Sequence, residues 1–262
     1  CIIALGMTKI VSSTVLEKAY ITQKLEETNF YAETYELVKS NFENYIYQSG
    51  LDEVVLENIC TEEKVKNDIN QIISNIYDGT DIKIDTTEIS DNLNANIDEL
   101  NIKNSRNASA IEQFVKHITD EYTNTILHTQ YEDEINTAYG KINALIEKAN
   151  TILIIAIIVD AIIIILFNIK KIARNLQDAG IGLLTASIFT LISCNIVQTK
   201  VNIAGIKIFN DSFSEVVVTI LQNIVEKINT FGMITLVVAI ILIVIYIITI
   251  LLQKTKEETT EK

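Results

Sequence analysis

Residues 151–167 read TILIIAIIVDAIIIILF, an apolar run in which Asp160 is the only charged side chain. As a helix this run would be about 25 Å long, slightly shorter than the roughly 30 Å hydrocarbon core of a bilayer. Two further apolar runs follow, 179–197 (AGIGLLTASIFTLISCNIV) and 231–252, which is dominated by Ile, Leu and Val. A soluble chain of 262 residues rarely holds three such runs, so the sequence predicts an integral membrane protein with three complete transmembrane helices.

The overall composition favours an all-α protein. The chain has no Pro, only 8 Gly and 3 Cys, so it lacks the turn residues of sandwiches and barrels and the cysteines of a disulfide scaffold. The formal net charge of −13 argues against nucleic-acid binding, because nothing would neutralise the phosphates. We therefore expect a helical membrane protein whose partners do not include nucleic acid.

The termini and the basic residues predict a topology. Residues 1–12 begin with the apolar stretch CIIALGM, and we expect the remnant of a transmembrane helix or signal anchor, with a lipid-modified Cys1 as the alternative. Short segments rich in Lys and Arg stay in the cytoplasm, and the segments with this character are Lys170–Arg174 and the charged tail 253–262. This rule places the C-terminus in the cytoplasm and residues 13–149 outside the plasma membrane.

Residues 13–149 are predicted to form an acidic, helical-bundle extracytoplasmic domain. Within 13–148 there are 11 Lys and Arg but 26 Asp and Glu. Apolar residues recur at helical spacing. Gly50 and Gly79 stand where helices should end, and Thr61 stands where a helix should begin. The membrane domain, 150–252, also contains a predicted amphipathic helix over 212–229, opened by the capping-box pattern Ser212-x-x-Glu215, which would lie in the membrane interface or pack on the extracytoplasmic domain.

Two features of the apolar runs are candidates for function. A carboxylate near the bilayer centre costs about 2.5–3.5 kcal/mol on insertion scales, so Asp160 is either an assembly contact or an ion or proton site. Gly182-x-x-x-Ala186 is a small-xxx-small pattern, which allows close helix packing. Asp160 is the candidate functional residue, and Gly182 and Ala186 are candidate packing residues.

The sequence predicts neither catalytic residues nor a cofactor or metal site. His117, Glu121, His128 and Glu132 share one helical face, but the two His lie about 16 Å apart along the axis and cannot bind one ion. We therefore expect a solvated face there. Cys60 is the only Cys between residues 13 and 148, which excludes a disulfide within that segment.

These observations predict a non-enzymatic integral membrane protein. We expect an interaction, sensor-like or scaffold component of a bacterial cell-envelope assembly, with the lipid bilayer and a protein partner or a second copy as its contacts. The alternative is a transporter or channel subunit that uses Asp160. An extracytoplasmic hydrolase or metalloenzyme is a third, more distant reading.

Overall fold

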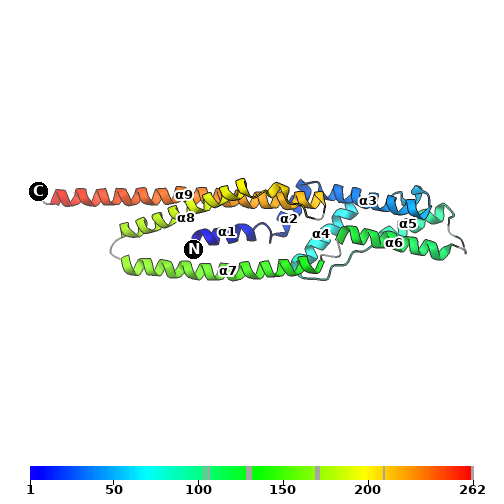
Figure 1. The fold of residues 1–262 in the computed structure, drawn as a ribbon. Coiled ribbons are helices and arrows are strands. Elements are labelled where there is room, and N and C mark those ends of the chain that lie inside the picture. Colours follow the sequence, from blue (N-terminus) through cyan, green and yellow to red (C-terminus); the bar gives the residue numbers. More distant parts are fainter. Residues whose placement is uncertain (103, 105–106, 128–131, 169–171, 209, 261–262) are drawn as a thin grey trace. The chain divides into compact units, whose positions relative to one another are not determined.

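The computed structural model describes residues 1–102, 104, 107–127, 132–168, 172–208 and 210–260. The chain is 85% helical and has no β-strand among these residues, which confirms the all-α prediction. Two short 3-10 helices, η1 (Glu53–Leu56) and η3 (Ile203–Gly205), connect longer elements. The α-helices labelled in Figure 1 are α1 (Ile2–Ser12), α2 (Lys18–Glu27), α3 (Phe30–Ser49), α4 (Glu62–Asp78), α5 (Thr87–Glu99), α6 (Ala108–Leu127), α7 (Glu132–Asn168), α8 (Ile172–Lys200) and α9 (Asp211–Thr260).

The chain divides into two compact units. Unit 1 comprises Cys1–Val15, Asn143–Lys207 and Val217–Lys262. Unit 2 comprises Leu16–Ile142 and the short segment Ile208–Val216. The apolar runs therefore fall in unit 1, whereas most of the acidic residues fall in unit 2.

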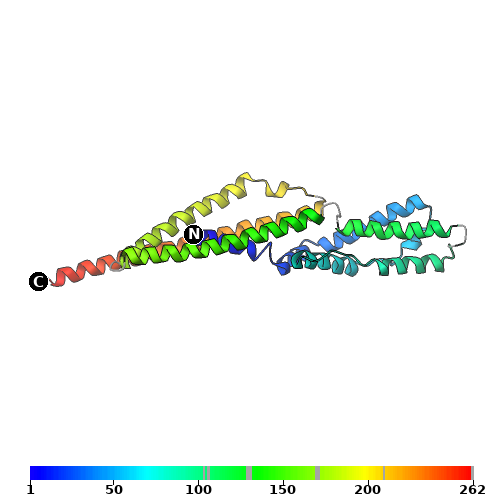
Figure 2. The same ribbon diagram turned by 90° about the horizontal axis from the view of Figure 1, so that it is seen from below.

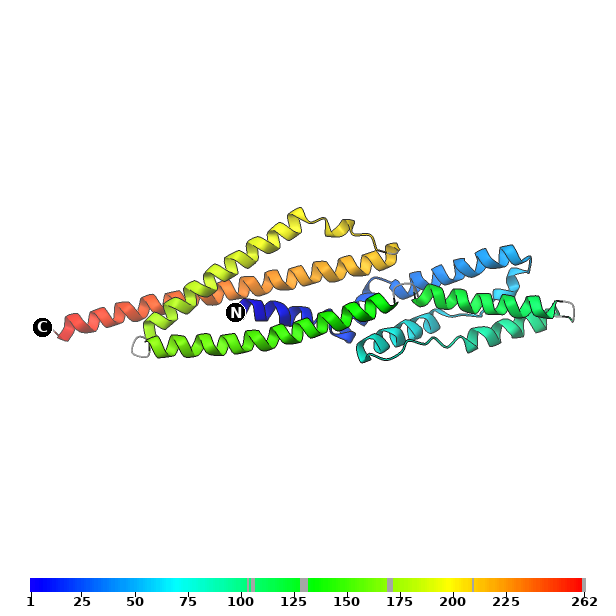
Figure 3. The same ribbon diagram turned by 60° about the horizontal axis from the view of Figure 1, so that its bottom comes forward.

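Unit 2 is a helical bundle with a buried core. Helices α3 and α6 lie side by side, with α4 and α5 packed on them (Figures 1 and 3). The apolar faces predicted from helical spacing supply the core, and side chains from four helices are fully or almost fully covered. They include Val38, Phe42, Val65, Ile89, Leu93, Ile97, Ile118 and Tyr122.

Local sequence signals set the helix ends in unit 2 as expected. Gly50 and Gly79 follow α3 and α4 with φ of 72° and 65°, in the left-handed region that glycine adopts without steric cost. The Thr61 hydroxyl accepts a hydrogen bond from the Lys64 amide at 3.2 Å and so caps α4.

The segment Ile208–Val216 corrects the predicted capping box at Ser212. Asn210, not Ser212, caps the helix: its side-chain oxygen accepts a hydrogen bond from the Phe213 amide at 2.8 Å. The Ser212 hydroxyl donates to the Glu33 carboxylate, and the Phe213 ring meets that of Phe30 edge to face, 6.3 Å between centroids. The polar side chain of Ser212 therefore serves a contact with α3 rather than the end of its own helix.

The predicted amphipathic helix 212–229 is not a separate element. It continues into the apolar run 231–252 as one helix, α9, which extends to Thr260. Gly232 lies within this continuous helix, and a Cβ there would lie 3.2 Å from atoms of Thr190 and Leu191 on α8, so the missing side chain allows the two helices to approach closely.

Unit 1 contains helices that are suited to a membrane. Two helical stretches are long and apolar enough to cross a bilayer, Ala173–Gly205 and Asp211–Gln253, and they include the predicted spans 179–197 and 231–252. Figure 2 shows the chain turning from α8 into α9 through η3. The run 151–167 lies within α7, which is helical from Glu132 to Asn168.

Candidate functional site

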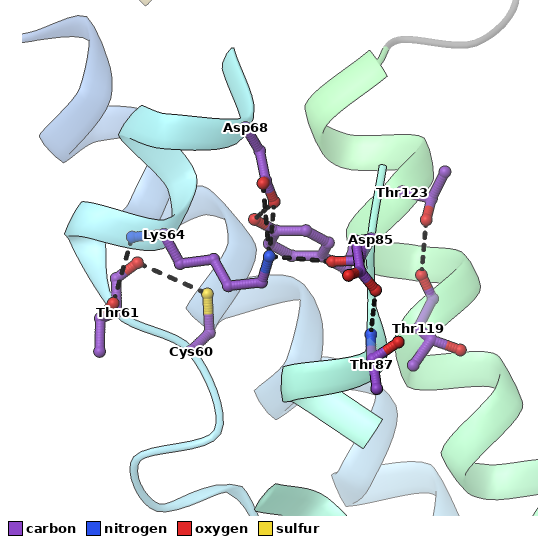
Figure 4. Close-up of polar contacts among 9 residues, drawn as sticks. Cys60, Thr61, Lys64, Asp68, Asp85, Thr87, Thr119 and Thr123 are labelled. Carbon is purple, nitrogen blue, oxygen red and sulfur yellow. Dashed lines mark hydrogen bonds and ion pairs between the residues drawn. The ribbon is translucent and has the colours of Figure 1, made fainter. Parts of the chain in front are cut away.

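The most distinctive polar arrangement in unit 2 is a buried cluster formed by Lys64, Asp68 and Tyr122. The Lys64 ammonium lies 3.0 Å from Asp68 Oδ2 and donates to the main-chain carbonyl of Asp85 at 2.9 Å (Figure 4). The Tyr122 hydroxyl donates to Asp68 Oδ2 at 2.5 Å. The Lys64 and Asp68 side chains are only 10% and 9% exposed, so the ion pair is shielded from water.

This cluster joins three parts of the chain. Lys64 and Asp68 stand one turn apart on α4, Tyr122 comes from α6, and Asp85 precedes α5. The Lys64 ammonium also lies 5.7 Å from the centre of the Tyr122 ring, within the range of a cation–π contact. Tyr122 is fully buried and Asp68 nearly so, and their hydrogen bond joins α4 to α6.

Cys60 lies beside this cluster, and its chemistry is suppressed (Figure 4). Its thiol is buried and donates to the Thr61 carbonyl at 3.7 Å. Burial raises the pKa of the Cys60 thiol to about 12 and outweighs the opposite effect of Lys64. A thiol that stays protonated at neutral pH is a poor nucleophile, so Cys60 contributes packing.

Helical spacing alone does not identify Lys64, Asp68 and Tyr122 as a polar cluster. A signal was available, since Lys64-x-x-x-Asp68 is an ion pair at helical spacing that flanks the apolar stripe residues Val65 and Ile69. Pairs of this kind usually lie on the surface. Only the packing of α6 against α4 shows that this one is buried.

Asp160, the candidate from the sequence, is placed on α7 with an exposed side chain. Three hydroxyl residues of α8, within the apolar run 179–197, are candidate donors to its carboxylate. Each of them donates instead to the carbonyl four residues earlier in its own helix, at 2.5–3.0 Å. These residues are Thr185, Ser187 and Thr190.

The close approach between α8 and α9 occurs at a glycine other than the predicted one. A Cβ at Gly180 would lie 2.8 Å from Cγ1 of Ile243 and 3.4 Å from the carbonyl of Ala239, whereas a Cβ at Gly182 would meet no atom within 4 Å. Gly182 is exposed and Ala186 half-buried. Gly180 therefore serves packing within the chain, whereas Gly182 makes no close approach to α9.

Two matched variants should therefore differ: leucine at Gly180 should disturb the α8–α9 contact, and leucine at Gly182 should not. Gly180→Leu should destabilise the α8–α9 contact by about 1–3 kcal/mol, because overpacking forces the helices apart. Buried Cys194 on α8 should then react at least about fivefold faster with N-ethylmaleimide in the detergent-solubilised chain. Gly182→Leu is the control and should leave this rate unchanged. Equal rates for Gly180→Leu and the parent chain would contradict the packing.

The histidine constellation lies only in part within the described residues. His117 is exposed and its ring stacks obliquely on Tyr45, 5.4 Å between centroids. His128 and the side chain of Glu132 lie outside the described residues. Within the described part of the chain, no group of three or more His, Cys, Asp or Glu side chains could hold a metal ion.

One open cleft of about 350 Å³ lies between η1 and α5. Asn96 holds the two elements together, because its amide donates to the carbonyls of Val55 and Glu57 at 3.0 and 2.8 Å. The cleft is lined by carboxylates, amides and aliphatic side chains, with no nucleophile paired with a base among its described residues. This arrangement offers no evident route to covalent or general acid–base chemistry.

No protein-family model, curated protein or solved structure matches this chain.

Proposed function

We propose that the protein is a non-enzymatic integral membrane protein that serves as an interaction or scaffold component of a cell-envelope assembly. In this proposal unit 1 lies in the plasma membrane and unit 2 is an extracytoplasmic domain. The helices α7, α8 and α9 each cross the bilayer, and α1 lies in the same bilayer beside them. The C-terminal tail lies in the cytoplasm.

The observation that carries the proposal is the exposure of large apolar side chains along the helices of unit 1. Phe189 on α8, Ile234 on α9 and Leu166 on α7 are 73%, 58% and 67% exposed. In the apolar windows of Ala173–Gly205 and Asp211–Gln253, only 22% and 11% of the residues are buried within the chain. Such surfaces are costly in water but match the hydrocarbon of a bilayer.

Support for α7 and α1 as membrane helices comes from the same kind of surface and from two specific contacts. Exposed Ile, Leu and Val residues continue along α7 from Ile152 to Leu166. The Thr8 hydroxyl of α1 donates to the Asn150 side chain at 2.5 Å, at the start of the apolar run of α7. A Cβ on Gly6 would collide with the Phe231 ring, so α1 also approaches α9 closely.

The proposed role in interaction rests on the contrast between the two units. Unit 2 has a well-buried core, an acidic surface and a sealed polar cluster rather than an accessible reactive group. A folded domain of this kind on a membrane base is suited to contacts with other proteins. The acidic surface of unit 2 favours partners with a basic surface, because opposite charges attract.

Thiol labelling from outside intact cells tests the orientation. The chain offers two exposed positions, Thr80 after α4 and Thr255 near the end of α9. In a chain with Cys1→Ser, Cys60→Ala and Cys194→Ser, we expect a membrane-impermeant maleimide to label Thr80→Cys in intact cells. The matched Thr255→Cys chain should react only after permeabilisation. The reverse pattern would contradict the proposed orientation.

A further inference from the structure

The part of α7 around Asp160 is uncovered in this chain. Ile158 and Val159 before it, and Ile162 and Ile163 after it, are between 47% and 55% exposed. Asp160 lies nine residues after Thr151 and eight before Asn168. At 1.5 Å per residue Asp160 is therefore at least about 10 Å along the helix axis from either end of the apolar run. A carboxylate at this depth cannot easily reach water.

Within the described residues, no ion pair or hydrogen bond reaches Asp160. The Thr185, Ser187 and Thr190 hydroxyls of α8 donate within their own helix. The basic residue on α1 is also too far away. Lys9 adjoins Thr8, which is bonded to Asn150, and Asn150 lies about 15 Å from Asp160 along α7.

Charge complementarity distinguishes the possible occupants of this face. A second copy of the chain would bring another carboxylate to the same depth, and its apolar runs 151–167, 179–197 and 231–252 contain no Lys or Arg. Two carboxylates repel each other unless they share a proton. A helix with a basic side chain at mid-depth supplies the charge and hydrogen-bond donors that Asp160 lacks.

We propose that the Asp160 face of α7 binds a transmembrane helix of another protein that carries a Lys or Arg near the middle of the bilayer. This inference rests on the proposed function, because it requires α7 to span the membrane. The partner's N–H groups donate to the Asp160 carboxylate, and the exposed Ile and Val side chains around it pack against the partner helix. Asp160 is then a recognition residue for assembly.

Energy transfer in vesicles tests this inference directly. The full chain, labelled with a donor fluorophore at exposed Cys1, is reconstituted in phosphatidylcholine vesicles with acceptor-labelled transmembrane peptides. The peptides are identical Leu/Ala helices with a central Lys, Leu or Asp. We expect the Lys peptide to associate at least about tenfold more strongly than the Leu peptide. Asp160→Leu and Asp160→Asn should remove this preference, whereas Thr185→Leu, which removes an exposed polar group from α8, should retain it.

Three results would overturn the inference. The first is equal association of the Lys and Leu peptides, and the second is a Lys preference that survives in Asp160→Leu. The third is energy transfer between donor- and acceptor-labelled copies of the chain that Asp160→Leu abolishes, which would assign the face to a second copy. Flotation of the same vesicles distinguishes this inference from the proposed membrane function. If the chain floats with its lipid but shows no Lys preference, only the proposal of a basic partner helix is contradicted.

Discussion

We expect unit 2 to open at least about 100-fold more often in the Asp68→Asn variant than in the parent chain. The substitution keeps the size of the side chain, and its amide oxygen still accepts from Tyr122. It removes the charge that neutralises Lys64, whose side chain is only 10% exposed. Breaking a buried ion pair by removing one partner typically costs about 3–5 kcal/mol, because an unpaired charge is left behind.

Hydrogen exchange of the α4 and α6 amides measures this opening in the full detergent-solubilised chain. The matched control is Glu36→Gln, which breaks the exposed pair between Lys39 and Glu36 and should change exchange little. The triple variant Lys64→Met, Asp68→Leu, Tyr122→Phe removes all three polar groups together and should recover most of the stability. Exchange in Asp68→Asn as slow as in the control would show that the cluster does not hold α4 to α6.

We also expect unit 2 to unfold as the pH rises from about 9 to 12. Burial raises the pKa of Cys60 and of Tyr31 to about 12, and it also raises the pKa of Tyr77 and Tyr122. Below about pH 9 the folded and unfolded chains both keep these protons. Above pH 9 the unfolded chain loses them first, near its ordinary values of 9 for Cys and 10 for Tyr, so stability falls. For Cys60 alone the effect is about 4 kcal/mol.

Tyrosinate absorbance follows this transition. The tyrosines whose pKa burial raises, Tyr31, Tyr77 and Tyr122, should ionise together, above the ordinary pKa of 10, as helix content falls. Return to pH 8 should reverse the change. If Tyr31, Tyr77 and Tyr122 ionised near pH 10 while the helices of unit 2 persisted, these side chains would not be buried as described.

Local signals in the sequence were sufficient for the features that depend on neighbouring residues. Gly50, Gly79 and Thr61 set helix ends through their own backbone or side-chain chemistry, and all three act as predicted. The apolar runs 179–197 and 231–252 likewise define helices by composition alone. Such features need no knowledge of the tertiary fold.

Features that depend on packing between distant segments could not be read in the same way. Spacing placed Lys64 and Asp68 on one face of α4, but their burial depends on Tyr122, 54 residues beyond Asp68. The small-xxx-small pattern at Gly182 predicts close helix packing, but it does not show which face of α8 meets α9. Gly180 makes that contact. The contact of Phe213 with Phe30 had no periodic signal, because only a short segment returns to unit 2.

Flotation after alkaline extraction tests the central claim, that unit 1 is embedded in a bilayer. Membranes from cells that express the full chain are washed with carbonate at about pH 11, which strips peripheral proteins, and are then floated on a density gradient. We predict that the chain rises with the lipid even when unit 2 has unfolded, since the apolar surfaces of α7, α8 and α9 remain in hydrocarbon. A chain that is released into the supernatant, or that stays at the bottom while the lipid floats, would contradict the claim.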